Sequence, residues 1–203
     1  MALVLGILLF IYWLFVPTLL SAVLPPAGKL GRDGMAVLLA IASWAVLATF
    51  VPIKVWPPRP LALPLGPTVL IALAALYLAL FAAGLRPRTD KTRDAETEGS
   101  AVTITLLSPV SEELLFRGLL LAIALPTLGG YGAVAFSALL FLAAHEVGRI
   151  GGARRSLREA LADLVFALLA GVLFLVSGTI LAPLVLHILV NGLYAYGARR
   201  GSS

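Results

Sequence analysis

The sequence predicts an all-α integral membrane protein, and two observations carry this prediction. Of the 203 residues, 61% are hydrophobic and 12% are charged, with a mean hydropathy of +1.04, whereas ordinary soluble domains are about 45–50% apolar and about 25% charged. Several apolar runs are long enough to cross a bilayer, and the short loops between them leave no room for a soluble domain. We therefore expect one polytopic transmembrane helix bundle, a single domain covering 1–203.

The apolar runs, each about 17 to 25 residues long, predict seven membrane-spanning helices. The expected spans are 2–24, 35–53, 67–85, 101–125, 131–147, 161–177 and 180–198. The first run is longer than the apolar region of a signal peptide and has no Lys or Arg before it, so we keep it as a helix. Counts of six and eight spans are the neighbouring alternatives.

Positive charge is distributed unequally between the two sides of these spans. Twelve of the fifteen Lys and Arg residues fall on one side and two on the other, while Arg117 lies inside a span. Because positive loops are retained in the cytoplasm, we expect a protein of the cytoplasmic (inner) membrane with its N-terminus outside and its C-terminus in the cytoplasm. The polar segment 86–100 is then a cytoplasmic linker, and the amphipathic segment 152–164 lies along the interface.

Two features of the composition exclude other classes of function. The sequence pI is about 10.0, but the basic residues lie in loops and form no interleaved basic and aromatic stripe, so no nucleic-acid partner is expected. The chain has no cysteine, which excludes a thiol nucleophile and a cysteine-ligated zinc site.

Three charged residues lie within the apolar segment 101–125: Glu112, Glu113 and Arg117. An ionisable side chain at membrane depth costs about 2.5–3.5 kcal/mol on insertion scales, so it indicates a functional site with partners. Glu113 and Arg117 are four residues apart and share a helix face, so we expect them to pair. Glu112 points about 100° away from that pair. A poorly solvated carboxylate is a strong base, which makes Glu112 the candidate general base.

Both histidines of the chain also lie in apolar segments. Phe141 and His145 are one helical turn apart, so the phenyl ring can pack beside the imidazole and limit its contact with water. His187 and Asn191 share one face of the last predicted helix, where Asn191 is either an oxyanion donor or an interhelical hydrogen-bonding residue. His145 lies nearer the cytoplasmic end of its span, so we expect the site to open toward the cytoplasm.

Together these residues form three motifs in a fixed order. The motifs are EExxxR at Glu112, Glu113 and Arg117, FxxxH at Phe141 and His145, and HxxxN at His187 and Asn191. In this order, on late helices of a polytopic protein, they resemble the CPBP (Abi) family of intramembrane proteases, which includes type II CAAX prenyl endopeptidases and bacteriocin-processing or immunity proteins. The resemblance covers about 108–192, within a motif-bearing catalytic half of about 101–198.

The resemblance implies an intramembrane endopeptidase of the glutamic type. Glu112 would activate the attacking water with help from His145, and His187 and Asn191 would stabilise the oxyanion. The residues expected to organise the site are Glu113, Arg117 and Phe141. Members of the family have been viewed both as glutamic proteases and as metalloproteases, and Glu112, His145 and His187 are residue types that ligate zinc. We favour a metal-free site because the HExxH arrangement is absent.

The expected partners are membrane lipids and a membrane-associated peptide or lipidated protein. A CAAX-type C-terminus, a bacteriocin leader and a C-terminal sorting tail are all compatible substrates. Two alternatives come from other classes of function. A proton- or ion-coupled transporter also uses intramembrane Glu and His residues, although we find no matching pair of interrupted helices in the two halves. A non-catalytic immunity or scaffold protein on the same fold is the second alternative.

Overall fold

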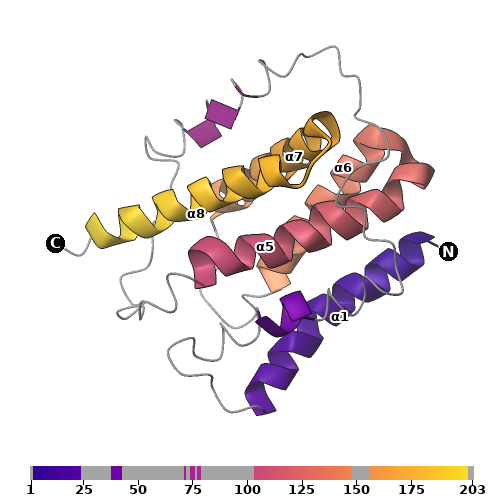
Figure 1. Ribbon diagram of the computed structural model, residues 1–203, viewed down its shortest axis with the longest axis horizontal. Coiled ribbons are helices and arrows are strands. Elements are labelled where there is room, and N and C mark those ends of the chain that lie inside the picture. The colour runs from indigo at the N-terminus through magenta and orange to yellow at the C-terminus, as the bar shows by residue number, and fades with distance from the viewer. Residues whose placement is uncertain are drawn as a thin grey trace.

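The computed structural model describes residues 2–23, 38–42, 71, 74, 75, 77, 78, 103–147 and 156–200, and this part of the chain is helical and contains no strand (Figure 1). Its elements are α1 (Ala2–Val23), the π-helical segment η3 (Thr103–Leu107), α5 (Ser108–Glu113), the π-helical segment η4 (Leu114–Leu121), α6 (Ala122–Val147), α7 (Leu157–Ser177) and α8 (Leu181–Arg200). The all-α prediction is confirmed for these residues.

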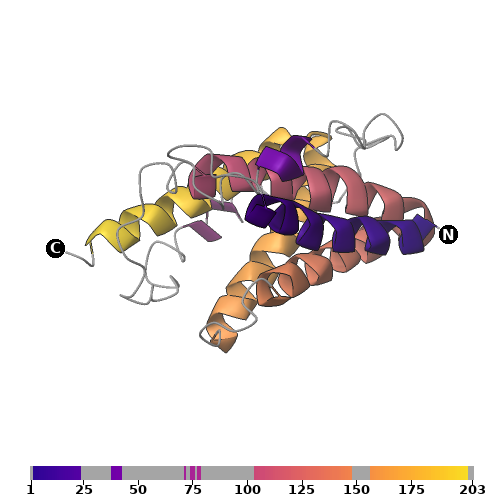
Figure 2. The same cartoon turned by 90° about the horizontal axis from the view of Figure 1, so that it is seen from below.

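The segments η3, α5, η4 and α6 form one helical run that folds back on itself. Gly129 interrupts the run with φ 67° and ψ 177°, a left-handed backbone conformation that glycine adopts without a steric penalty. Beyond Gly129 the chain returns along its own first arm (Figures 1 and 2), and the Ser137 hydroxyl donates to the Phe116 carbonyl at 2.7 Å. The two arms correspond to the predicted spans 101–125 and 131–147.

A second hairpin joins α7 to α8. Ser156 begins α7 with a capping box, in which its hydroxyl accepts from the Glu159 amide and the Glu159 carboxylate accepts from the Ser156 amide. Gly178 ends the helix in the left-handed conformation. Most of the predicted interfacial segment 152–164 is therefore the first two turns of α7.

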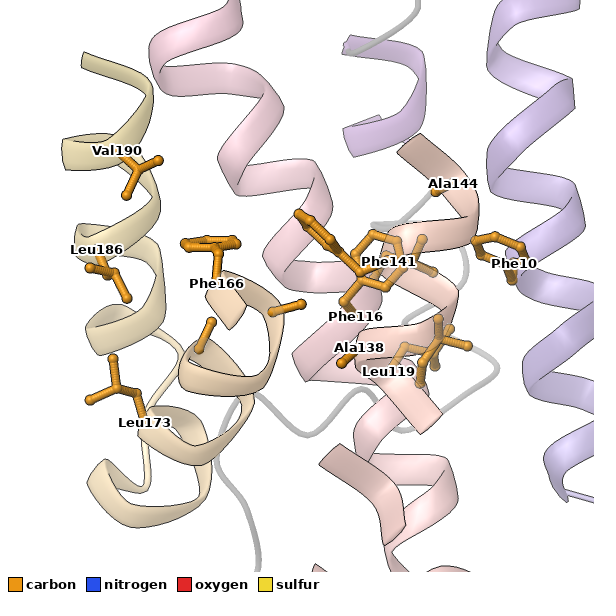
Figure 3. Packing of buried hydrophobic residues seen from close by; sticks show 14 residues of the cluster. Phe10, Phe116, Leu119, Ala138, Phe141, Ala144, Phe166, Leu173, Leu186 and Val190 are labelled. Carbon is orange, nitrogen blue, oxygen red and sulfur yellow. The ribbon is translucent and has the colours of Figure 1, made fainter. Parts of the chain in front are cut away.

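The apolar core is centred on aromatic rings from several helices (Figure 3). Phe116 of η4, Phe141 of α6 and Phe166 of α7 are buried together, and Phe10 of α1 packs against Phe116 with ring centroids 6.3 Å apart. The Phe141 centroid is 5.0 Å from that of Phe116 and 5.6 Å from that of Phe166. These rings fix η4 and α6, which carry motif residues, relative to α1 and α7.

Polar and apolar side chains are distributed as in a membrane protein. Among the residues that the structure describes, the buried polar ones are Ser111, Glu112, Glu113, Arg117, Ser137 and His187. Large apolar side chains are exposed along α1 and α8: Val4, Leu5, Ile7, Leu8, Ile11, Phe15, Leu19, Leu181, Val185 and Leu189. Water would penalise such apolar stripes, whereas lipid solvates them.

Length and composition identify two helical stretches of the described residues as candidate membrane spans: Thr105–Glu146 and Leu157–Ser177. The first contains the fold-back at Gly129. Shorter apolar helices cover Leu3–Val16 and Leu181–Leu193. Most of the predicted spans 35–53 and 67–85, and the whole linker 86–100, lie outside the described residues, so the count of seven spans stays a prediction.

Candidate active site

The two neighbouring glutamates of α5 face different surroundings. Glu113 is fully buried, and its Oε1 accepts hydrogen bonds from Arg117 Nη1 at 3.0 Å and from His187 Nδ1 at 2.8 Å. The pairing with Arg117 matches the sequence prediction. The bond to His187 was not predicted, because residues 74 positions apart in sequence show no spacing signal.

Arg117 is held on several sides at once. Besides Glu113, its Nη2 donates to the Ala167 carbonyl of α7 at 3.2 Å. Its guanidinium carbon lies 5.2 Å from the ring centroid of Phe141 and 5.7 Å from that of Phe166, within cation–π range. The arginine therefore joins three helices as well as balancing the charge of Glu113.

The two carboxylate oxygens of Glu112 have different surroundings. Its Oε1 accepts a hydrogen bond from the Ser108 hydroxyl, one helical turn earlier. Its Oε2 is buried without a hydrogen-bond donor and faces His145 Nε2 at 3.9 Å and His187 Nε2 at 3.7 Å. The structure thus brings the predicted base and both histidines together from α5, α6 and α8.

Each histidine is oriented through its other ring nitrogen. His145 Nδ1 lies 3.0 Å from the Phe141 carbonyl, which only accepts, so this nitrogen carries the proton. His187 Nδ1 donates to the Glu113 carboxylate in the same way. In a neutral ring this leaves a lone pair on Nε2, and both Nε2 atoms point toward Glu112.

The centre of the site is therefore lined by acceptors. Glu112 Oε2 and the two Nε2 atoms all present lone pairs when the imidazoles are neutral. Buried acceptors that face one another are unfavourable unless a donor lies between them. A water molecule carries two O–H donors and can satisfy two of these three acceptors at a time, since atoms 3.7–3.9 Å apart can share one water through hydrogen bonds of about 2.8 Å.

Aromatic rings hold the imidazoles in place. Phe141 stacks on His145 with centroids 4.3 Å apart, as its position one turn before the histidine predicts. Phe166 meets His187 edge to face at 4.6 Å. His187 is nearly fully buried, while 30% of the His145 side chain is exposed. His145 therefore lies on the accessible side of the site.

Asn191 lies one helical turn after His187 on α8 and is half buried. Sequence analysis missed two residues that contact the site, Ser108 and Phe166. Ser108 had a usable signal, since it precedes Glu112 by four residues on the same helix. Phe166 had none, because its contact with His187 depends on the packing of α7 against α8.

Zinc fits this site poorly. Zinc binds histidine nitrogen and carboxylate oxygen at about 2.0–2.2 Å, which puts two tetrahedral ligands about 3.4 Å apart. The separations of 3.7 and 3.9 Å from Glu112 Oε2 are wider, and within the described residues no group of three His, Asp or Glu side chains is arranged to hold a metal ion. The donor types suit zinc, but their spacing does not.

An apolar helical protein with glutamates, an arginine and histidines converging in its interior has the character of an intramembrane enzyme. Residues 98–193 match the family model of the type II CAAX prenyl endopeptidase Rce1-like proteins. The matched residues hold all three motifs, and the match supports the resemblance of this part of the chain to the CAAX (CPBP) membrane proteases. A comparison with curated proteins and with solved structures found no match.

Proposed function

We propose that the protein is an intramembrane endopeptidase that hydrolyses a peptide bond of a membrane-associated substrate, with water activated by Glu112. The observation that carries the proposal is the buried Oε2 of Glu112, which lacks a donor and faces two imidazole nitrogens. A carboxylate in this position is ready to take a proton from a water held between it and His145. Carboxylates and imidazoles are the side chains most used for such proton transfer.

The reaction then proceeds as general-base hydrolysis. Glu112 Oε2 takes one proton from the water while His145 Nε2 accepts a hydrogen bond from its second O–H. The resulting hydroxide attacks the scissile carbonyl carbon, and the negative charge moves to the carbonyl oxygen. Glu112 next gives its proton to the leaving amine as the C–N bond breaks, which regenerates the carboxylate and releases an acid and an amine.

The oxyanion would be stabilised by His187 Nε2 and the Asn191 amide. His187 can donate from Nε2 only as an imidazolium, since its Nδ1 already bonds Glu113. Glu113 bonds Nδ1 and so holds the ring with its Nε2 toward the reacting water.

The family match favours a CAAX-type prenylated C-terminus as the substrate class. A bacteriocin leader or a C-terminal sorting tail would place the same peptide chemistry at the membrane. The partially exposed His145 marks the side from which peptide and water reach Glu112. The mechanism uses no metal ion.

Cleavage of a farnesylated CAAX peptide by the purified protein tests the function directly. We expect release of the C-terminal fragment, a loss of about 10²–10⁴-fold in Glu112→Ala and His145→Ala, and unchanged rates after metal chelation. Cleavage by both variants at the parental rate would refute the mechanism, and loss of activity restored by added zinc would refute the metal-free route. A parent that binds the peptide without cleaving it would indicate a non-catalytic scaffold.

We also propose that the protein lies in the cytoplasmic membrane with its C-terminus inside. The distribution of Lys and Arg supports this orientation. Since the chain has no cysteine, each single-cysteine variant carries one label. A membrane-impermeant maleimide on intact cells should label Thr179→Cys, in the turn between α7 and α8, and spare Ser202→Cys; the reverse pattern would invert the topology.

A further inference from the structure

The Ser108 hydroxyl donates a hydrogen bond to Oε1 of Glu112, the proposed catalytic carboxylate. Among the described side chains, no other forms a hydrogen bond to this carboxylate. Ser108 begins α5 at its junction with η3, and Glu112 follows one helical turn later. Within a helix, a serine hydroxyl commonly bonds the backbone carbonyl of the preceding turn. Here it instead points along the helix toward the carboxylate.

This hydrogen bond determines which oxygen of Glu112 faces the histidines. The last torsion of a glutamate side chain is broad and close to two-fold, so by itself it holds the carboxylate plane only loosely. With Oε1 fixed by Ser108, Oε2 is directed at His145 Nε2 and His187 Nε2. Without the hydroxyl, no described donor bonds either oxygen of Glu112.

We propose that Ser108 is a positioning residue for the base, holding the Glu112 carboxylate in the orientation that aims Oε2 at the water. The proposal rests on the proposed function of Glu112. Ser108 lies within the matched region but outside the three motifs, so its role comes from this contact alone. It acts through Glu112 and forms no bond to the substrate.

Three variants test the role: Ser108→Ala removes the hydroxyl, Ser108→Thr keeps it, and Ser111→Ala is the matched control. Ser111 lies on the same helix immediately before Glu112, but its hydroxyl accepts from Trp13 Nε1 at 3.0 Å and does not contact the carboxylate. Each variant is purified in detergent and assayed with the farnesylated CAAX peptide. Thermal unfolding shows that each one is folded.

We expect Ser108→Ala to lower kcat about ten- to hundredfold, since small errors in the position of a catalytic group have effects of this size. KM should stay within about twofold because the hydroxyl does not bind substrate. Ser108→Thr should recover most of kcat, and Ser111→Ala should keep it. Equal kcat in the parent and Ser108→Ala would overturn the proposal, and so would a trapped acyl adduct on Ser108, which would make the residue a nucleophile.

Infrared spectroscopy separates this proposal from the proposed function. Loss of a hydrogen bond to Glu112 shifts its carboxylate stretching band. Ser108→Ala should therefore shift this band when it is introduced into the parent. Introduced into the Glu112→Gln protein, which has no carboxylate at this position, it should leave the carboxylate region unchanged. If the parent fails to cleave the peptide, the proposed function is wrong, and the infrared comparison still decides whether Ser108 holds the carboxylate. An unchanged band would refute the role of Ser108 even in an active enzyme.

Discussion

The site has two halves that differ in the partners of their glutamates. In the inner half, Glu113 is fully buried and its Oε1 bonds both Arg117 and His187. Each glutamate has its Oε2 buried without a donor, but in the outer half the Oε2 of Glu112 faces both histidines, and 30% of the His145 side chain is exposed. One step along the helix, about 100° of rotation, separates the two environments.

This difference shows how adjacent, chemically identical side chains acquire different roles. Two hydrogen bonds to its Oε1 hold Glu113 in place, so this residue stabilises the site and orients His187. The Oε2 of Glu112 faces both histidines beside the partly exposed His145, where it can accept a hydrogen bond from a reacting water. A preorganised site requires both kinds of residue: a reactive group such as Glu112 and supporting residues such as Glu113 that hold its neighbours in position.

Breaking the inner half should have the largest effect on stability. Replacing Arg117 by Met leaves Glu113 buried without its cation, and removal of one partner of a buried ion pair costs about 3–5 kcal/mol. We expect a loss of this size in the free energy of unfolding, measured in mixed micelles. Arg117→Lys, which keeps the charge but loses the planar fork, should lose less, and a fully stable Arg117→Met protein would show that the pair does not hold the site together.

Matched substitutions of the two glutamates compare the halves directly. Glu113→Gln weakens charged hydrogen bonds to Arg117 and His187 and should lower the free energy of unfolding by about 1.5–3 kcal/mol. Glu112→Gln keeps an oxygen that can accept from Ser108 and loses only the longer contacts of 3.7 and 3.9 Å to the histidines, so its loss of stability should be smaller than that of Glu113→Gln. Thermal unfolding of the two proteins side by side measures the contrast; equal losses would mean that the halves do not differ as described.

The sequence predicts contacts within one helix better than contacts between helices. Glu113 with Arg117 and Phe141 with His145 meet because residues four apart share a helix face. The bond from His187 to Glu113 depends on how α8 packs against α5, which local spacing does not encode. The fold shows the same difference. Apolar runs predict the individual helices, whereas the fold-back at Gly129 and the aromatic core depend on how the helices pack against one another.

Two phenylalanines of α7 allow the orientation of His187 to be tested separately from packing of the core. Phe166 touches His187 and Arg117, whereas Phe174, eight residues later and fully buried, packs in a different apolar cluster. Each Phe→Leu change should cost about 1–2 kcal/mol of stability through lost packing. Only Phe166→Leu should also lower kcat, by about tenfold, because the imidazole loses its support. Equal kcat values for the two variants would assign Phe166 to packing alone.

The smallest expected effect comes from α1, which lies outside the matched region and still contacts the catalytic helix. Trp13 Nε1 donates to the Ser111 hydroxyl at 3.0 Å, and its ring meets Phe116 edge to face at 5.8 Å. Trp13→Phe keeps an aromatic ring but removes the donor, and should cost about 1 kcal/mol. In a double-mutant cycle with Ser111→Ala, the two losses should be less than additive by about 0.5–1 kcal/mol. Additive losses would mean that α1 supports the glutamate helix by apolar packing, without this hydrogen bond.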